Sequence, residues 1–148
     1  MTPSPPAVLA DLAALMARNA APDVPPAERA GALGLSAMVL GVAAELFDRQ
    51  AHILVEENRA VRTLLARGAE LLPNPGDGAR LNHLAQTTDV DFRVSALQAA
   101  NAELRRALIE LQCALEGDPR PGARVIEAAI WDELRAATER RKLAASSV

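Results

Sequence analysis

The sequence predicts an all-α protein, and three observations carry this prediction. Alanine, leucine, glutamate and arginine dominate the 148 residues, and all four favour helices. Apolar residues recur at alternating spacings of four and three, as they do in helices that pack along one another. No stretch of useful length alternates apolar with polar residues, as a half-buried strand would. We expect a single domain over residues 1–148, an antiparallel helical bundle of four main helices, one of them very long or kinked, plus a short helical turn.

The first helix is predicted over residues 5–20. Ser4 suits the N-cap, and Pro5 suits the first turn because proline lacks the N–H that a helix start leaves unpaired. The apolar side chains that follow fall on one face, at Val8, Leu9, Leu12, Leu15 and Met16.

The second predicted helix covers residues 26–71, in which no proline follows Pro26. A helix of this length would reach ~60 Å, more than the diameter of a compact domain of this size. A kink near residues 48–51 is therefore an alternative, but these residues are not helix breakers and one continuous helix is favoured. Its apolar seam comprises Leu33, Ala37, Leu40, Ala44, Phe47, Ala51, Leu54, Asn58, Val61 and Leu65.

A stripe of small residues runs along the start of this helix. It consists of Ala30, Gly34, Ala37, Gly41 and Ala44. Small side chains let another helix approach closely, and the predicted helix 5–20 is the expected neighbour. The alternative is a groove for the acyl or isoprenoid tail of a ligand.

The middle of the chain is predicted to turn and then form a third long helix. Residues 72–78 hold two prolines and two glycines and are predicted to form a loop, followed by a short helical turn over 80–86. The next helix is predicted over 89–116, with Thr88 or Asp89 as its cap and Gly117 at its end. Its seam is the most regular in the chain: Val90, Val94, Leu97, Asn101, Leu104, Leu108, Leu111 and Leu115.

The last helix is predicted over residues 122–143, after a turn rich in proline and glycine. Ile126, Ile130, Leu134 and Ala137 share its inner side. The tail over residues 144–148 is expected to fray.

Two asparagines, Asn58 and Asn101, replace apolar residues in the seams. A buried amide left unpaired costs about 1–3 kcal/mol, so each needs a partner. The favoured interpretation is structural, since seam asparagines set register or oligomeric state, and the alternative is a polar pocket between helices. The structural interpretation predicts that Asn101→Leu raises the melting temperature and blurs the oligomeric state.

His52 and Glu56 lie four residues apart on one helical face and are further candidates for a polar core or pocket. Metal sites in bundles need a Glu-x-x-His motif on two helices, which this sequence lacks, so a solvated face is favoured and no metal is expected. No phosphate-binding loop or Gly-x-Ser-x-Gly turn is present, and Cys113 has no histidine nearby in sequence. The sequence therefore predicts no catalytic residue, no cofactor-binding residue and no cofactor.

Charge and composition narrow the classes of function. The net charge is −3, and no basic patch is interleaved with aromatic residues, so nucleic-acid binding is not expected. The single cysteine, Cys113, favours a reducing cytoplasm. The N-terminus lacks the basic start of a signal peptide, and the apolar stretch 33–47 is too short to cross a bilayer. A soluble, cytoplasmic protein with no membrane partner is expected.

Three segments carry a resemblance to a known family. They are RAGALGLSAMVLGVAAELF (29–47), ENRAVRTLLARG (57–68) and AANAELRRALIELQCALEG (99–117). In this order they resemble a small bacterial all-α family of unknown function, whose members look to be encoded beside acyl-CoA dehydrogenases and aminoglycoside-phosphotransferase-like proteins. The C-terminus departs from the family pattern, since Thr138-Glu139-Arg140-Arg141 stands where an Asn-Pro-Arg-Tyr-like ending is expected. The resemblance implies an all-α fold and supplies no catalytic residue.

The sequence favours a non-catalytic helical-bundle protein that acts through protein–protein contacts. We expect self-association through helix faces, as a homodimer, and an accessory role toward a neighbouring partner enzyme. The alternative is a protein or enzyme that binds an acyl or other apolar-tailed small molecule between its helices, with its polar end near the four polar candidates. Whether the protein is an enzyme stays open, with a non-enzymatic role favoured.

Overall fold

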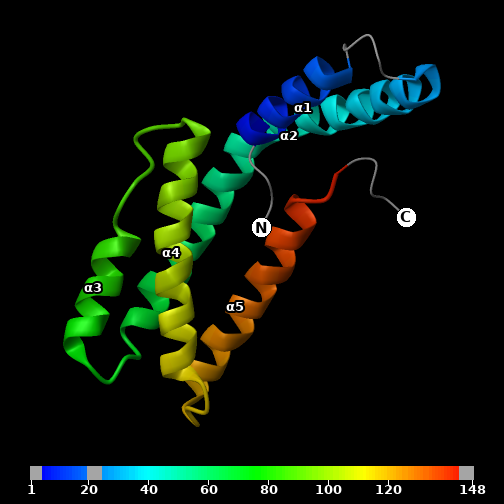
Figure 1. Cartoon of the computed structure of the whole chain (residues 1–148). Helices are drawn as coiled ribbons and strands as arrows, with labels where there is room; N and C mark the ends of the chain where they lie inside the picture. The colour runs from blue at the N-terminus through cyan, green and yellow to red at the C-terminus, as the bar shows by residue number, and fades with distance from the viewer. Residues whose placement is uncertain (1–4, 20–24, 144–148) are drawn as a thin grey trace. The chain divides into compact units, whose positions relative to one another are not determined.

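The structure, a computed structural model, describes residues 5–19 and 25–143. All regular structure in these ranges is helical, which confirms the predicted all-α fold. Contacts divide the chain into two compact units, one ending at Gln50 and one beginning at Ala51. The helices are α1 (Pro5–Asn19), α2 (Pro26–Ala69), α3 (Pro75–Ala85), α4 (Val94–Leu115) and α5 (Pro121–Arg140), as Figure 1 shows.

Helix α2 runs without interruption over 44 residues, as the favoured prediction states. At 1.5 Å per residue it is about 65 Å long. This length lets a single helix contribute its first half to one unit and its second half to the other.

The second unit is built on the second half of α2, where the predicted seam is confirmed. Leu54, Val61 and Leu65 of α2 are buried, and so are six of the eight predicted seam residues of α4. Three of the four predicted inner positions of α5 are buried as well. The residues that fill this core are Val61, Leu64, Leu65, Ala69, Leu81, Leu104, Ala107, Leu108, Leu111, Leu115, Ala123, Ile126 and Ile130.

The predicted start of α4 is wrong by several residues. Val90 is 88% exposed and precedes the helix, which begins at Val94 with Arg93 at its N-cap. Neither predicted cap is used, because the Asp89 carboxylate pairs with Arg62 of α2 instead. A contact between distant segments has displaced the local capping bond that sequence spacing suggested.

The predicted loop before α3 is shorter than expected, because the helix begins inside it at Pro75. Asn74 is the N-cap, and its Oδ1 accepts a hydrogen bond from Gly76 N at 2.9 Å. Proline is well suited to a first helical turn, and glycine to a close approach of two backbones. Gly78 is such a site, since a Cβ there would lie 2.8 Å from the carbonyl oxygen of Ala69. Asn74, Pro75 and Gly76 are residue types that are common in loops, but here they form the start of a helix.

The ends of the last two helices follow the sequence more closely. Gly117 has φ +77°, in keeping with its predicted place just after α4. Helix α5 begins one residue before the predicted start and ends at Arg140, three residues early. The predicted cap at Ser4 and the predicted tail over 144–148 lie outside the described residues.

In the first unit, α1 runs alongside the first half of α2 (Figure 1). The buried side chains of α2 here are Ser36, Ala43 and Leu46. The predicted seam residues of this half are exposed instead, so the prediction is wrong for them. Each buried position lies one residue before a predicted one, which is a rotation of about 100° around the helix axis. Both sets have seam-like spacing, so periodicity alone does not choose between them.

Among the described residues, no helix packs closely against the stripe of small residues. Gly34 and Gly41 have no atom within 4 Å of the place where a Cβ would stand, and the alanines of the stripe are exposed. The prediction that this stripe packs closely against the first helix is therefore wrong. It lies on the open side of α2.

Candidate functional site

The structure brings together two of the four polar candidates. Asn58 of α2 and Asn101 of α4 are both buried. His52 is exposed, while Glu56 is half-buried with its Oε1 atom 2.6 Å from Nη1 of Arg59. His52 and Glu56 thus lie apart from the interior, and only the two asparagines share a site.

The amides of Asn58 and Asn101 bond to each other across the two helices. Asn101 Nδ2 donates to Asn58 Oδ1 at 2.9 Å. Asn58 Nδ2 in turn donates to Asp89 Oδ1 at 3.2 Å and to the carbonyl oxygen of Leu97 at 3.4 Å. Both amides therefore have partners in the interior, which offsets the cost of removing them from water.

A glutamate that sequence analysis did not single out lies beside these amides. Glu57 is fully buried, and Arg141 Nε and Nη2 donate to its two oxygens at 2.7 and 2.6 Å. Arg105 Nη2 donates to Oε2 at 3.0 Å, and Asn101 Nδ2 lies 3.4 Å from the same atom. The carboxylate joins α2 to α4 and to the end of α5. We refer to Glu57, Asn58, Asn101, Arg105 and Arg141 as the buried polar cluster.

The Glu57 carboxyl is held in its ionised form. Burial alone would raise its pKa, but the hydrogen bonds and positive charges of Arg141 and Arg105 outweigh burial and lower the pKa below its ordinary value of 4.5. A general base must take up a proton in the course of a reaction, and this environment disfavours the protonated form. The cluster is therefore suited to fixing helices in register and poorly suited to proton transfer.

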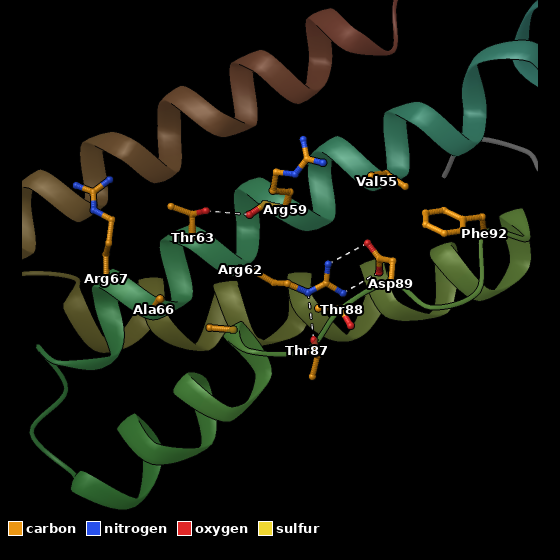
Figure 2. Close-up of a pocket in the computed structure, with 11 residues that line it drawn as sticks. Val55, Arg59, Arg62, Thr63, Ala66, Arg67, Thr87, Thr88, Asp89 and Phe92 are labelled. Atoms are coloured by element: carbon orange, nitrogen blue, oxygen red, sulfur yellow. Dashed lines mark hydrogen bonds and ion pairs between the residues drawn. The ribbon is translucent and has the colours of Figure 1, made fainter.

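A second ion pair holds the segment between α3 and α4 against α2. Arg62 Nη2 and Nη1 donate to the two oxygens of Asp89 at 2.7 and 2.9 Å, and Arg62 Nε donates to Thr87 Oγ1 at 3.1 Å (Figure 2). The hydrogen bonds from Arg62 lower the pKa of Asp89 below 3.8, against the opposing effect of burial. This forked geometry fixes both side chains in one orientation.

The functional residues that sequence analysis missed differ in the strength of their sequence signals. Arg105 lies four residues after Asn101, and its Nε donates to Asn101 Oδ1 at 3.1 Å, so helical spacing could have found it. Glu57 lies next to Asn58 but outside the predicted seam. Arg141 is 84 residues from Glu57, and no local sequence pattern predicts that ion pair.

Several grooves flank α2 in the second unit. The larger groove, of about 600 Å³, lies between α2 and the segment 85–92, and two others, of about 540 and 470 Å³, lie between α2 and α5. None of the three is lined by Asn58 or Asn101, whereas Glu56 lines the one of about 470 Å³. The larger groove is lined by Val55, Arg59, Arg62, Thr63, Ala66, Arg67, Ala85, Thr87, Thr88, Asp89 and Phe92 (Figure 2).

The acidic, histidine and cysteine side chains do not gather. Within residues 5–19 and 25–143, no three of them are grouped so that they could hold a metal ion. Cys113 is an exposed free thiol on α4. The chemistry that these ranges do place together is that of carboxylates, amides and arginines in ion pairs.

The first half of α2 presents an exposed apolar surface. Between residues 30 and 47, every exposed residue is apolar, and Leu33 and Phe47 are 53% and 75% exposed. At about 100° per residue, Leu33, Leu40 and Phe47 form a ridge, and the small residues form a trough beside it. Leu35 and Met38 are also exposed and lie beyond the far side of the trough. We refer to the ridge and the trough together as the exposed α2 face: Leu33, Leu40 and Phe47 in the ridge, and Ala30, Gly34, Ala37, Gly41 and Ala44 in the trough.

By length and composition alone, α2 is apolar enough to cross a membrane. An 18-residue window of this helix has a mean hydropathy of 1.8, and 11% of that window is buried. Core helices of soluble proteins, which are mostly buried, and signal sequences pass the same test of length and composition. The sequence prediction concerned the stretch 33–47 alone, and α2 continues beyond that stretch at both ends. That the chain does not cross a membrane stays a prediction.

Comparisons of the chain with protein-family models, with curated proteins and with solved structures find no match.

Proposed function

We propose that the protein is a non-catalytic helical-bundle protein that acts through protein–protein contacts, and that its exposed α2 face binds the same face of a second copy. The observation behind this proposal is the exposure of Leu33, Leu40 and Phe47 at seam spacing. Contiguous apolar patches are uncommon on soluble monomers and mark interaction surfaces. A seam with spacings of four and three is what a partner helix packs against.

A second copy fits this face because the face is complementary to itself. The ridge of large side chains lies directly beside the trough of small ones, and Gly34 and Gly41 leave open space there. In a dimer with two-fold symmetry the same patch meets itself, so the ridge of each copy can enter the trough of the other. No charged residue among the exposed positions from 30 to 47 opposes the approach.

The second unit supports this proposal through the state of its carboxylates. Glu57 and Asp89 are each paired with arginine and held ionised, which suits a rigid scaffold. We extend the proposal to a cytoplasmic location, on the single cysteine, and to an accessory role beside a neighbouring enzyme, on the family resemblance.

Sedimentation velocity over a range of protein concentrations tests the dimer. We expect the wild type to form a dimer and Leu40→Glu to be monomeric, because the glutamate would place a charge in the ridge. Leu40 is exposed, so the variant should keep its helical circular dichroism. Ile109→Glu is the matched control, since Ile109 is an exposed apolar residue of α4, and it should remain dimeric. A wild type that stays monomeric at every concentration, or a control that dissociates equally, contradicts the proposal.

A bilayer is the competing partner for the same face. Flotation of the purified protein with phosphatidylcholine vesicles distinguishes the two. The proposal predicts that the dimer remains in the dense fractions. Flotation that Leu40→Glu abolishes would assign the face to lipid and overturn the proposed dimer.

A further inference from the structure

The larger groove beside α2 is more positive than the chain as a whole. Its lining holds three arginines and one acidic residue, Arg59, Arg62, Arg67 and Asp89, whereas the whole chain has a net charge of −3. Its volume of about 600 Å³ is within the range of small-molecule sites. A concave surface with an excess of positive charge attracts anions.

One wall of the groove is fixed before any ligand arrives. Arg62 is held by Asp89 and Thr87 through three hydrogen bonds of 2.7 to 3.1 Å, and its charge is balanced by that carboxylate. Thr87 Oγ1 also donates to the carbonyl oxygen of Leu84 at 2.7 Å. This wall can therefore position a ligand without rearranging, while the charge that attracts an anion must come from the other arginines.

Arg59 and Arg67 supply that charge. Within the described residues, Arg67 is exposed and takes part in none of the ion pairs. Arg59 pairs with Glu56, but this is an exposed pair of neighbours on one helix, a kind that contributes little and exchanges readily with solvent. The two arginines are eight residues apart, or about 12 Å along the helix, and Thr63 lies between them. Both arginines also line the groove between α2 and α5, and their guanidinium groups lie apart in Figure 2. Binding of one anionic group by both would therefore require their long, exposed side chains to turn toward each other.

The end of the groove away from Arg67 is apolar and adjoins Arg59. Phe92 and Val55 lie there with their side chains facing each other (Figure 2), and Phe92 is 64% exposed. Its segment is anchored to α2 three residues earlier by Asp89. An exposed aromatic ring on an anchored segment offers a surface on which a flat ring can stack.

We propose that this groove binds a small molecule in which a phosphate is joined to a flat ring, with the phosphate between Arg59 and Arg67 and the ring against Phe92. This site goes beyond the proposed function, since all its residues belong to the second unit and none to the exposed α2 face. A failure of one proposal leaves the other standing.

Isothermal titration calorimetry with two simple probes, AMP and UMP, tests the site. At least one of them should bind more tightly than its parent nucleoside and more tightly than inorganic phosphate. Arg67→Ala and Phe92→Ala should each raise the Kd about tenfold, which corresponds to about 1.4 kcal/mol. Both residues are exposed, so the variants should keep the wild-type circular dichroism and melting temperature. Arg106→Ala is the matched control, an exposed arginine of α4 that does not line the groove, and should leave the Kd unchanged.

Three results would overturn this proposal. The first is absence of binding by both nucleotides. The second is equal binding of the nucleotide and its parent nucleoside, or of the nucleotide and free phosphate, because one half of the site would then be idle. The third is an equal loss of affinity in Arg67→Ala and Arg106→Ala, which would reflect general charge attraction.

Discussion

Asn101→Leu gives the sharpest test of the buried polar cluster, because the contacts reverse the sign expected from the sequence. Asparagine and leucine have the same number of side-chain heavy atoms and the same branching, so the change leaves no cavity. The two methyl groups need more room than the oxygen and the amide group that they replace, which adds to the cost of the change. What it removes is one donor to Asn58 Oδ1, at 2.9 Å, and one acceptor for Arg105 Nε, at 3.1 Å. It also removes the weaker contact to Glu57 Oε2, at 3.4 Å.

These lost contacts determine the expected change in the free energy of unfolding. The Asn58 oxygen is fully buried and loses its donor, which costs about 1–3 kcal/mol. The side chain of Arg105 is 31% exposed, so water can replace its lost partner at little cost, and Glu57 keeps its arginine donors. Burying leucine contributes up to about 1.5–3 kcal/mol in an apolar site, and much less here because charged and amide groups surround it. We expect a net destabilisation of about 1–2 kcal/mol, and a melting temperature lower by roughly 2–4 °C per kcal/mol for a chain of this length.

Urea denaturation followed by circular dichroism measures this effect. Ala102→Leu is the control, because it adds a leucine at the next, exposed position of α4 and should change the unfolding free energy by less than about 0.5 kcal/mol. A higher melting temperature for Asn101→Leu would show that the cluster does not stabilise the second unit, and would refute this reasoning.

Three further predictions concern the α4 seam, two glycines and the Glu57 carboxylate. Leu104→Ala should lower the unfolding free energy by about 2–5 kcal/mol, because Leu104 is fully buried. Glu103→Ala, at an exposed position, should lower it by less than about 0.5 kcal/mol. Equal losses for the two variants in urea denaturation would refute the α4 register. Gly31→Ala should stabilise α2 by about 0.5–1 kcal/mol, because its new methyl group meets open space. Gly78→Ala should destabilise the protein, because its methyl group would press on the backbone oxygen of Ala69. Thermal melts should therefore show a higher melting temperature for the first variant and a lower one for the second. Stability should decline as the pH falls below 4.5, since the pKa of Glu57 is lower in the folded state than in the unfolded state and its contribution is lost on protonation. Glu57→Gln should flatten this decline in urea titrations from pH 6 to pH 3, and an unchanged slope would show that other carboxyls cause it.

Helical periodicity predicts much of the fold, because burial of an apolar face is a local and repetitive requirement. The α4 seam from Leu97 to Leu115 and the α2 seam from Leu54 to Leu65 follow from it. The same rule failed in the first half of α2, where two apolar stripes lie side by side on the helix. Which stripe becomes buried depends on how α1 packs, and spacing within α2 contains no information about that.

Of the residues in the candidate site, only the two asparagines could be predicted from the sequence. Asn58 and Asn101 stand out because each interrupts an apolar seam. Glu57 and Arg141 do not, because their pairing joins residues far apart in the sequence and the fold alone brings them together. Local sequence spacing predicts Asp89 as a helix cap, but its carboxylate instead forms a stronger, forked ion pair with Arg62.

Cross-linking across the exposed α2 face tests the proposed association most directly. Single cysteines at Ala30, Ala37 and Ala44, each in a Cys113→Ser background, should yield a disulfide-linked dimer at one or more positions under mild oxidation, because helices packed through small residues lie within about 8–10 Å of each other. Ala102→Cys, on the exposed side of α4, should yield none. Absence of a linked dimer at all three positions, or equal linkage at the control, would contradict the account.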